Sequence, residues 1–325
     1  MRRRLAARGA ALTVRFAWTP VILPDAGSPH FAHPGAAVGP DGTLYLGAAD
    51  GRGIHRVDST GAVSMVAVPT TECHDIGICA DGSIWIADPG RKEVLRDGIL
   101  SVRTTSGRVV LVNRSGARLR ELEPPTASWR LTAVVTDGSR VWVADGSGYG
   151  YGYGYGENLV HAFEHDGTLL WTTDASASGT TLSTPHGLVV DPRGAEPRLL
   201  VADRGNHRIV ALTLGGEYLD TFGHDVLTFP SGLTIAGEIL WVSELFGAVV
   251  GLDRAGDVIA NVGDASVPAD TVWPNTRVGN QITAPDLTLP QLRSPHGVAA
   301  LATGELLVTE WLIGGRATIL SPIWH

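Results

Sequence analysis

Cysteine is scarce in this chain. Only two cysteines occur among 325 residues, Cys73 and Cys79. On one extended strand their separation of six residues holds them about 20 Å apart, too far for a disulfide bond. The sequence therefore excludes a disulfide framework and favours a reducing compartment.

Clustered positive charge is also missing. The formal net charge is −8, and no run of Lys or Arg follows the opening Met-Arg-Arg-Arg. Proteins that bind nucleic acid or anionic membranes need a basic surface, so neither is expected as a partner. Arg8 and Arg15 interrupt the stretch after the first arginines and leave no uncharged apolar core for a secretory signal. We expect a cytoplasmic protein, and a monomer.

Regular apolar periodicity of 3.6 residues, the mark of amphipathic helices, is almost absent. Hydrophobic residues make up 44% of the chain, and there are 41 glycines and 19 prolines. This composition is typical of many short strands joined by tight turns. We predict an all-β protein that forms a single domain over residues 1–325.

A recurring phrase organises the chain. The stretch "TPHGLVV" at residues 184–190 returns as "SPHGVAA" at 294–300. Each copy has a small or proline-flanked start, a short apolar strand, a turn, and a second strand that ends in an acid in most copies. Six copies can be aligned: "HPGAAVGPDGTLYLGA", "CHDIGICADGSIWIADPG", "RLTAVVTDGSRVWVADG", "TPHGLVVDPRGAEPRLLVADRG", "FPSGLTIAGEILWVSELFG" and "SPHGVAALATGELLVTEWL".

The spacing of these copies predicts a six-bladed β-propeller. Units of this size, each of about four short strands, are typical of propeller blades. Asp-Gly turns at residues 41–42, 81–82 and 137–138 are expected to join the first two strands of a blade. Only one strand fits after Glu310, so residues 11–19 are expected to complete the last blade and close the ring. The predicted blades start near Pro34, His74, Leu131, His186, Ser231 and His296, at spacings of 40, 57, 55, 45 and 65 residues.

Three of these starting positions are histidines, and they belong to alternate blades. His74, His186 and His296 are expected at one end of the central channel, 120° apart around its axis. Three converging imidazoles with an open fourth position suit a catalytic zinc ion. His30 and His33 lie just before the first blade and could reach the same channel mouth. The alternative for each histidine is a hydrogen-bonded structural role.

The acids that end the second strands recur in blades with and without a histidine, and we expect them to bind backbone amides between blades. The residues after the acid differ from blade to blade. Arg204 stands there in blade four, and the low-complexity stretch "GSGYGYGYGYGENL" stands there in blade three. Its tyrosines are candidates for a lid over the pocket, with an exposed excursion or a protein-contact patch as alternatives. The acids are Asp88, Asp145, Asp203, Glu244 and Glu310.

The long segment at residues 264–293 separates blades five and six. It is polar and rich in proline, and we expect it to cross one face of the propeller, where it could narrow the channel, or to form a surface excursion. Trp273, Asn275 and Arg277 are its candidate substrate contacts.

The phrases "TPHGLVVDPRG…LLVADRGNHRIVAL" and "SPHGVAAL" resemble NHL repeats, and the whole chain resembles the peptidyl-α-hydroxyglycine α-amidating lyases. The resemblance implies a catalytic zinc on His74, His186 and His296. It also implies a substrate-binding role for Arg204, which directly follows "VAD". The catalytic tyrosine of that family follows an Asp-Gly pair, which points to Tyr149, with Tyr151, Tyr153 and Tyr155 as competitors.

The chain departs from that family in several places. An aspartate that serves a structural calcium ion there is replaced by Gly297, while Asp75 follows the first histidine instead. The tyrosine is not adjacent to the Asp-Gly pair, because Ser147 and Gly148 intervene. A structural calcium ion is therefore a weaker expectation than the zinc.

Together these patterns predict a zinc-dependent lyase or hydrolase that acts on a small molecule or peptide in the central channel. A tyrosine from the glycine-tyrosine stretch would act as base, and Arg204 would hold a carboxylate. Oxidation is disfavoured unless the metal is copper or iron. The alternatives are a noncatalytic interaction propeller, or another propeller enzyme such as a lactonase or a streptogramin-opening lyase. Lactonase-like ligands would have to stand at Pro34, Leu131 or Ser231, which cannot supply them.

Overall fold

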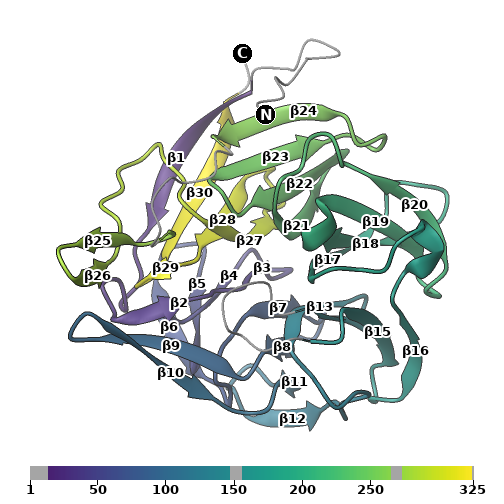
Figure 1. Ribbon diagram of the computed structural model, residues 1–325, viewed down its shortest axis with the longest axis horizontal. Coiled ribbons are helices and arrows are strands. Elements are labelled where there is room, and N and C mark those ends of the chain that lie inside the picture. The colour runs from purple at the N-terminus through teal and green to yellow at the C-terminus, as the bar shows by residue number, and fades with distance from the viewer. Residues whose placement is uncertain (1–13, 147–155, 265–272, 324–325) are drawn as a thin grey trace.

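The computed structural model describes residues 14–146, 156–264 and 273–323. Within them, antiparallel β-sheets account for nearly all regular structure, and the helices are two three-residue 3-10 turns. Six four-stranded sheets surround a central axis as the blades of a propeller (Figure 1). The predicted all-β propeller is therefore confirmed. No helix in the described ranges is long and apolar enough to cross a membrane.

Each blade places its strands in chain order from the axis outward. Blade one holds β3 (Ala36–Val38), β4 (Leu44–Gly47), β5 (Gly53–Val57) and β6 (Val63–Ala67). Blade two holds β7 (Asp75–Ile78), β8 (Ile84–Asp88), β11 (Arg108–Val112) and β12 (Arg118–Glu121). Blade three holds β13 (Leu131–Thr136), β14 (Arg140–Asp145), β15 (Leu159–Glu164) and β16 (Leu169–Thr173).

The remaining blades follow the same plan, except that the last one takes its outermost strand from the start of the chain. Blade four holds β17 (Pro185–Asp191), β18 (Arg198–Asp203), β19 (Arg208–Thr213) and β20 (Tyr218–Phe222). Blade five holds β21 (Pro230–Ala236), β22 (Ile239–Glu244), β23 (Ala248–Leu252) and β24 (Val258–Gly263). Blade six holds β27 (Pro295–Ala300), β28 (Leu306–Glu310), β30 (Arg316–Ile323) and β1 (Arg15–Val21).

The pairing of β1 with β30 joins the two ends of the chain in one sheet (Figure 1). The strand was expected at residues 11–19, whereas it runs from Arg15 to Val21. It continues through Pro20, which can be tolerated because β1 is the outermost strand of its blade and a missing N–H breaks no inner ladder. Residues 11–13 lie outside the described ranges.

The apolar core lies between neighbouring blades. One cluster joins Leu46 and Val57 of blade one to Leu307 and Ala317 of blade six. The innermost strands contact one another in sequence around the axis, and β27 of the last blade contacts β3 of the first. The blades thus hold each other through apolar burial on their flat faces.

The Asp-Gly turns lie where they were expected, between the first two strands of blades one, two and three. Gly42, Gly82 and Gly138 have φ values of 80°, 81° and 94°. Residues with a Cβ rarely adopt this left-handed region, so glycine is the residue that such tight turns favour.

A seventh four-stranded sheet, which we call the accessory sheet, was not predicted. It is ordered β10 (Ile99–Thr104), β9 (Arg91–Arg96), β2 (His30–Ala32) and β29 (Leu312–Ile313). Its strands come from three distant parts of the chain, so no local sequence pattern predicts this sheet. The buried Lys92 Nζ donates to the Phe31 carbonyl oxygen at 2.9 Å and to Glu72 Oε2 at 2.7 Å. These bonds tie the accessory sheet to the segment that leads into blade two.

The described part of the segment between blades five and six packs against the accessory sheet. It forms a hairpin of β25 (Thr276–Val278) and β26 (Gln281–Thr283). Asn275 Oδ1 accepts a hydrogen bond from the Ile313 amide at 2.9 Å, and the Trp273 ring packs edge-on against Trp311. Asn275 and Trp273, two of the candidate substrate contacts, are thus engaged within the protein.

The acids at the ends of the second strands bind backbone amides, as predicted. Asp203 accepts from Ser183 at 2.7 Å, and Glu310 accepts from Arg293 at 2.7 Å and Ser294 at 3.2 Å. The amides belong to the segment that crosses from the preceding blade to the innermost strand of the acid's own blade. The same bonds are made by Asp88 with Thr71 and Glu72, by Asp145 with Arg130, and by Glu244 with Thr228 and Phe229. Each acid therefore fixes where its blade begins.

Replacement of Asp203 tests this role. Its fully buried carboxylate also binds Arg208 Nε at 2.6 Å. We expect Asp203→Ala to lower the free energy of unfolding by about 3–5 kcal/mol, because a buried cation and a buried amide lose their partner. The exposed Asp220 is the control, and Asp220→Ala should change stability by less than about 0.5 kcal/mol. Denaturant unfolding measures both; equal effects would contradict the structural role.

Candidate metal centre

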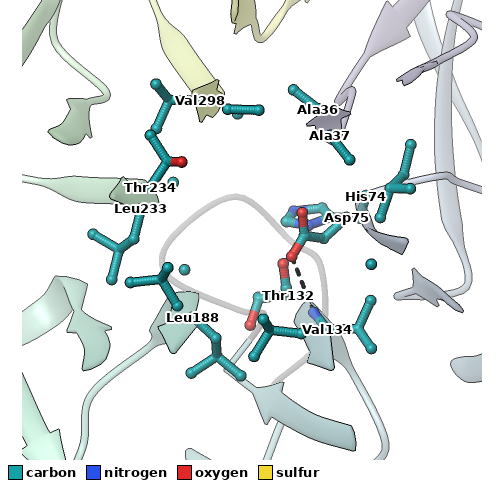
Figure 2. A pocket seen from close by; sticks show the side chains of 18 of the residues that line it. Ala36, Ala37, His74, Asp75, Thr132, Val134, Leu188, Leu233, Thr234 and Val298 are labelled. Atoms are coloured by element: carbon teal, nitrogen blue, oxygen red, sulfur yellow. Dashed lines mark hydrogen bonds between the residues drawn. The ribbon is translucent and has the colours of Figure 1, made fainter. Parts of the chain in front are cut away.

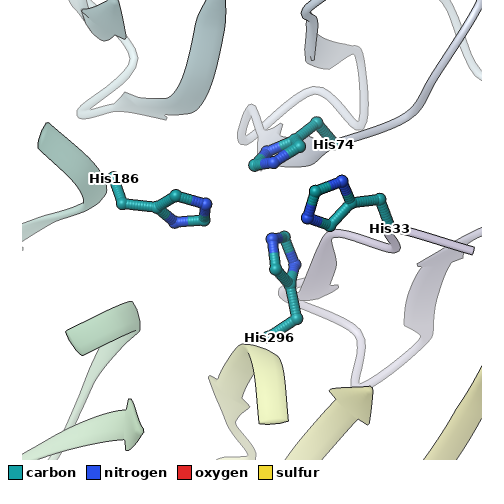
Figure 3. A group of neighbouring side chains, drawn as sticks. All are labelled: His33, His74, His186 and His296. Carbon is teal, nitrogen blue, oxygen red and sulfur yellow. The ribbon is translucent and has the colours of Figure 1, made fainter. Parts of the chain in front are cut away.

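Three of the predicted ligands converge on the axis of the propeller. His74 directly precedes β7, while His186 and His296 lie at the start of β17 and β27. Their ring centroids are separated by 4.9 Å for His74 and His186, 4.6 Å for His74 and His296, and 4.9 Å for His186 and His296. Figure 3 shows the rings pointing toward a common centre. The structure thus brings together the imidazoles of alternate blades.

His33 joins them from the segment between β2 and β3 (Figure 3). Its ring centroid lies 4.4 Å from that of His74 and 4.3 Å from that of His296. His30 does not take part, since its Nδ1 pairs with Ser28 Oγ at 2.7 Å. The sequence predicted that His30 and His33 could both reach the channel mouth. It gave no reason to prefer one of them as a ligand, because neither occupies a repeated blade position as His74, His186 and His296 do.

The second nitrogen of each symmetric histidine is held by the blade that comes next around the ring. His74 Nδ1 lies 2.8 Å from the Thr132 carbonyl oxygen, and His296 Nδ1 lies 3.3 Å from that of Pro34. A carbonyl oxygen only accepts, so Nδ1 carries the proton in both rings and leaves the Nε2 lone pair available. His186 Nδ1 lies 3.4 Å from Ser231 Oγ. Such partners on the far nitrogen are typical of histidines that bind metals.

The four rings are buried and uncharged at neutral pH. Their residues are 2–7% exposed. Burial, together with the nearby Arg204 guanidinium, lowers the pKa of His74 to about 3. Burial also lowers the pKa values of His33, His186 and His296 well below the ordinary value. Neutral imidazole is the form that coordinates a metal ion.

The donor set fits a metal ion. One ligand atom from each of the four histidines can be chosen so that all lie within 4.8 Å of one another. Nitrogens bound at about 2.1 Å lie about 3.4 Å apart around a tetrahedral ion and at most about 4.2 Å apart around a six-coordinate one, so the four side chains would have to move closer together to bind an ion. Among the described residues, none offers a hydrogen bond to the buried Nε2 of His296. A buried polar atom normally has a partner, and an ion would supply it. The same residues contain no second group of three or more His, Cys, Asp or Glu side chains close enough to share an ion, and the structural calcium ion stays a prediction.

The guanidinium of Arg204 lies close enough to the histidine cluster to add to burial in lowering the pKa values of His74, His186 and His296. Its Nε donates to the Pro230 carbonyl oxygen at 3.2 Å, and its Nη2 donates to Ser231 Oγ at 2.6 Å. The guanidinium also lies over the Phe229 ring, with its carbon 5.3 Å from the centroid. The residue is 7% exposed and is not part of the lumen wall. In this structure the guanidinium binds Ser231, the neighbour of His186, and its role toward a substrate carboxylate stays a prediction.

Tyr149 and Tyr151, the predicted catalytic tyrosines, lie outside the described residues, as do Tyr153 and Tyr155. Cys73 and Cys79 are both free and buried, in keeping with the exclusion of a disulfide framework.

The histidines lie at one end of a central lumen of about 220 Å³. Figure 2 shows this lumen, with the Asp75 carboxyl group and the His74 ring at its wall. Asp75 Oδ2 accepts a hydrogen bond from the Val134 amide at 3.0 Å, and burial raises the pKa of its carboxyl group to about 7. The sequence showed Asp75 only as a departure from the pattern. Among the described residues that line the lumen, Asp75 is the one that carries a carboxylate.

The glycine after a histidine or its equivalent allows the innermost strands to approach one another. A Cβ on Gly187 would overlap the Ser231 carbonyl oxygen, and one on Gly232 would lie 2.7 Å from the His296 carbonyl oxygen. These contacts join consecutive blades at the level of the histidines. The recurring His-Gly phrase is therefore a packing requirement as well as a source of ligands.

Comparisons with known proteins support the fold. No family model matches the chain, and no curated protein matches it. Solved structures do. A streptogramin B lyase has a TM-score of 0.60 at 15% identity, covering 97% of this chain and 100% of that one. Virginiamycin B lyase from Staphylococcus aureus has a TM-score of 0.55 at 14% identity, covering 95% and 100%. A gluconolactonase from Xanthomonas campestris has a TM-score of 0.61 at 16% identity, covering 97% and 99%. At these identities the likeness concerns the fold alone.

The contact at Gly187 can be tested by adding one methyl group. We expect Gly187→Ala to destabilise the protein by about 1–3 kcal/mol, because the strands of blades four and five must move apart. Gly215 is the matched control, since the nearest atom to a Cβ there is 3.5 Å away. Gly215→Ala should leave the unfolding midpoint unchanged or raise it slightly. Loss of stability in neither variant would contradict the close approach.

Proposed function

We propose that this propeller is a metal-dependent, lyase-type enzyme that acts on a small molecule in its lumen. The observation that carries the proposal is the convergence of four neutral imidazoles, one of which has a buried nitrogen without a hydrogen-bond partner in the described residues. The ligands would be His33, His74, His186 and His296. Location in the cytoplasm and a monomeric state also remain proposals.

The fourth imidazole bears on the choice of metal. A catalytic zinc ion usually has three protein ligands and keeps the fourth position for water or substrate. Four imidazoles would complete a tetrahedral zinc site and leave no such position. We therefore favour a divalent transition metal that accepts five or six ligands, and imidazole also suits iron, copper and nickel. Zinc would be catalytic here only if His33 stayed unbound.

When bound, such an ion would supply Lewis acidity toward an oxygen atom of a substrate. The residues of the chain would orient the ligands and transfer protons. The Nδ1 bonds to Thr132 and Pro34 fix the orientation of His74 and His296. Asp75 would accept or return a proton at its carboxylate oxygen, since it lines the lumen beside His74.

The proposed lyase class rests on the sequence, which resembles the amidating lyases in its three symmetric histidines. Structures that share the fold include streptogramin and virginiamycin B lyases and also a gluconolactonase, so the fold is compatible with lyase and hydrolase chemistry alike. In this structure Arg204 is engaged with Pro230 and Ser231. A substrate carboxylate held by that arginine therefore stays a prediction and is not part of this proposal.

A second candidate is a noncatalytic propeller that holds a structural zinc ion. The number of imidazoles favours it, because structural zinc sites are closed and four-coordinate. In this case the lumen would have no substrate, and the ion would contribute only to stability.

Metal analysis tests the proposed centre with a matched pair of variants. We expect about one transition-metal ion per purified chain, and loss of most of it in His33→Ala and His186→Ala. His30→Ala, from the same strand region but outside the cluster, should keep the ion. The measurement is elemental analysis by mass spectrometry together with the unfolding midpoint of each variant. Absence of metal in the parent protein would rule out both candidates.

The coordination number separates the two candidates. Cobalt(II)-loaded protein with four-coordinate metal should absorb visible light strongly, whereas five or six ligands give weak bands. Weak bands that change on addition of azide would support an accessible catalytic metal. Strong bands that azide leaves unchanged would favour the structural zinc site.

Asp75 is tested by a change of one functional group. We expect Asp75→Asn to retain the metal and the fold but to reduce turnover of small uncharged carbinolamides or lactones by about 10²–10⁴-fold, the usual contribution of a general acid or base. Asp166→Asn, on the exposed turn between β15 and β16, is the control. Unchanged turnover in Asp75→Asn would remove this residue from the chemistry.

A further inference from the structure

The fourth imidazole is positioned differently from the other three. The segments before the three symmetric histidines are held by the acids of their blades. In blade one, Ala48 stands where the other blades have the acid. His33 instead follows β2, a strand of three residues that belongs to the accessory sheet. The position of His33 therefore depends on how the accessory sheet is fixed to the propeller.

Lys92 lies at the junction between the accessory sheet and blade two. Of the 25 lysine and arginine residues in the chain, it is the only lysine. Its side chain is fully buried, and its Nζ donates to the Phe31 carbonyl oxygen at 2.9 Å and to Glu72 Oε2 at 2.7 Å. An ammonium is a compact charge that can bind acceptors in different directions, whereas a guanidinium is planar and larger. Lysine therefore suits a buried contact between two segments.

The two acceptors of Lys92 belong to the segments that carry two of the ligands. Phe31 is two residues before His33, and Glu72 is two residues before His74. The ring centroids of His33 and His74 are 4.4 Å apart (Figure 3). One ammonium thus joins both segments close to the imidazoles themselves.

The position of His74 is also held by contacts that do not involve Lys92. The blade acid Asp88 accepts hydrogen bonds from two amides just before this histidine, at 2.7 and 3.1 Å. The Thr132 carbonyl oxygen lies 2.8 Å from its Nδ1. Arg103 of β10 also reaches the same segment, where it donates to a carbonyl oxygen at 3.3 Å. Loss of the ammonium should therefore leave His74 in place.

The support of His33 comes from two sides. On one side, β2 pairs with β29, which follows directly after the second strand of blade six. The Trp311 ring, from the same connection, stacks on His33 with centroids 4.9 Å apart and planes at 15°. On the other side, Lys92 links β2 to blade two, next to His74. The ammonium therefore controls the separation between the fourth imidazole and its neighbour.

We propose that Lys92 is a positioning residue of the metal centre, which binds the His33 and His74 segments at once and so keeps the His33 imidazole within reach of the ion. This inference rests on the proposed function for the ion and deepens it, because it names the residue that sets the number of imidazoles. Zinc on three imidazoles keeps a position for water or substrate, whereas four imidazoles fill a tetrahedral site. Lys92 thus bears on whether the centre is open or closed.

The test compares the metal affinity of Lys92→Met/Glu72→Gln with that of the parent, in full-length protein with and without His33→Ala. Removing both charges of a buried pair at similar volume is often neutral for stability. Cobalt(II) affinity is measured by competition with a chelating dye. We expect about 10–100-fold weaker binding when His33 is present, the usual effect of losing a group that orients a ligand. In the His33→Ala background the change should stay below about 2-fold, because no fourth imidazole is left to position.

A neighbouring ion pair provides the matched control. Arg91 Nη2 lies 2.9 Å from Glu93 Oε1, and alternate residues of a strand face opposite sides, so this pair lies on the other face of β9 from Lys92. Arg91→Met/Glu93→Gln should keep the parent affinity. Glu72→Gln alone retains an oxygen that accepts from the ammonium and should also bind like the parent. An equal loss of affinity with and without His33 would indicate a merely structural role and overturn the proposal.

The number of bound imidazoles is counted by NMR of the cobalt(II) protein. Each bound ring with a protonated second nitrogen gives one strongly shifted, exchangeable N–H signal. We expect four such signals in the parent and three in Lys92→Met/Glu72→Gln. Three signals in the parent, or four in the variant, would overturn the role of Lys92. The count in the parent applies even where the variant fails to fold.

Spectra of the metal-free protein separate this inference from the proposed function. In ¹H–¹⁵N spectra of the imidazoles, we expect Lys92→Met/Glu72→Gln to move the ring signals of His33 and to leave those of His186 in place. This result in a protein that binds no metal would leave the positioning role standing while the proposed function fails. Bound metal with the same affinity in the parent and in the variant would do the reverse.

Discussion

The hydrogen bonds from a buried acid to the backbone that enters its own blade are the constraint on which this structure depends. Asp88, Asp203 and Glu310 hold the segments that precede His74, His186 and His296. A carboxylate that accepts two or three bonds within the protein fixes the backbone in a way that apolar packing alone does not. The position of each imidazole is therefore set two or three residues before the imidazole itself.

The internal repeat explains why so much of the architecture was predictable. The starts of the innermost strands, the Asp-Gly turns and the acids that end the second strands recur at matching positions. Each copy therefore supports the interpretation of the others. The histidines are noticeable because they occupy this repeated position in only three of the six blades. The terminal strand was also predictable, because the last repeat lacked one strand and the start of the chain offered one. The bounds of this strand were not predictable, because a proline such as Pro20 normally indicates the end of a strand. Only an outermost strand tolerates it, and that position was not known from the sequence.

The parts that the sequence did not reveal are those without a repeat. The accessory sheet combines segments near residues 31, 93 and 312, and two of its strands have only two or three residues. His33 belongs to the connection from this sheet, so its place in the cluster depends on contacts that no periodicity encodes. For Arg204 the backbone position was predictable from the repeat, but the contacts of the side chain were not. Its position beside a blade acid was clear, but the direction of its side chain was decided by Ser231, which is a neighbour only in space.

The strand pair β1 and β30 has a consequence for how the molecule is made. Residues 15–21 leave the ribosome long before their partners in β30. During synthesis β1 has no sheet to join until β30 has emerged. Five blades can in principle form while the chain is still growing, whereas blade six waits for a strand made about 300 residues after its partner.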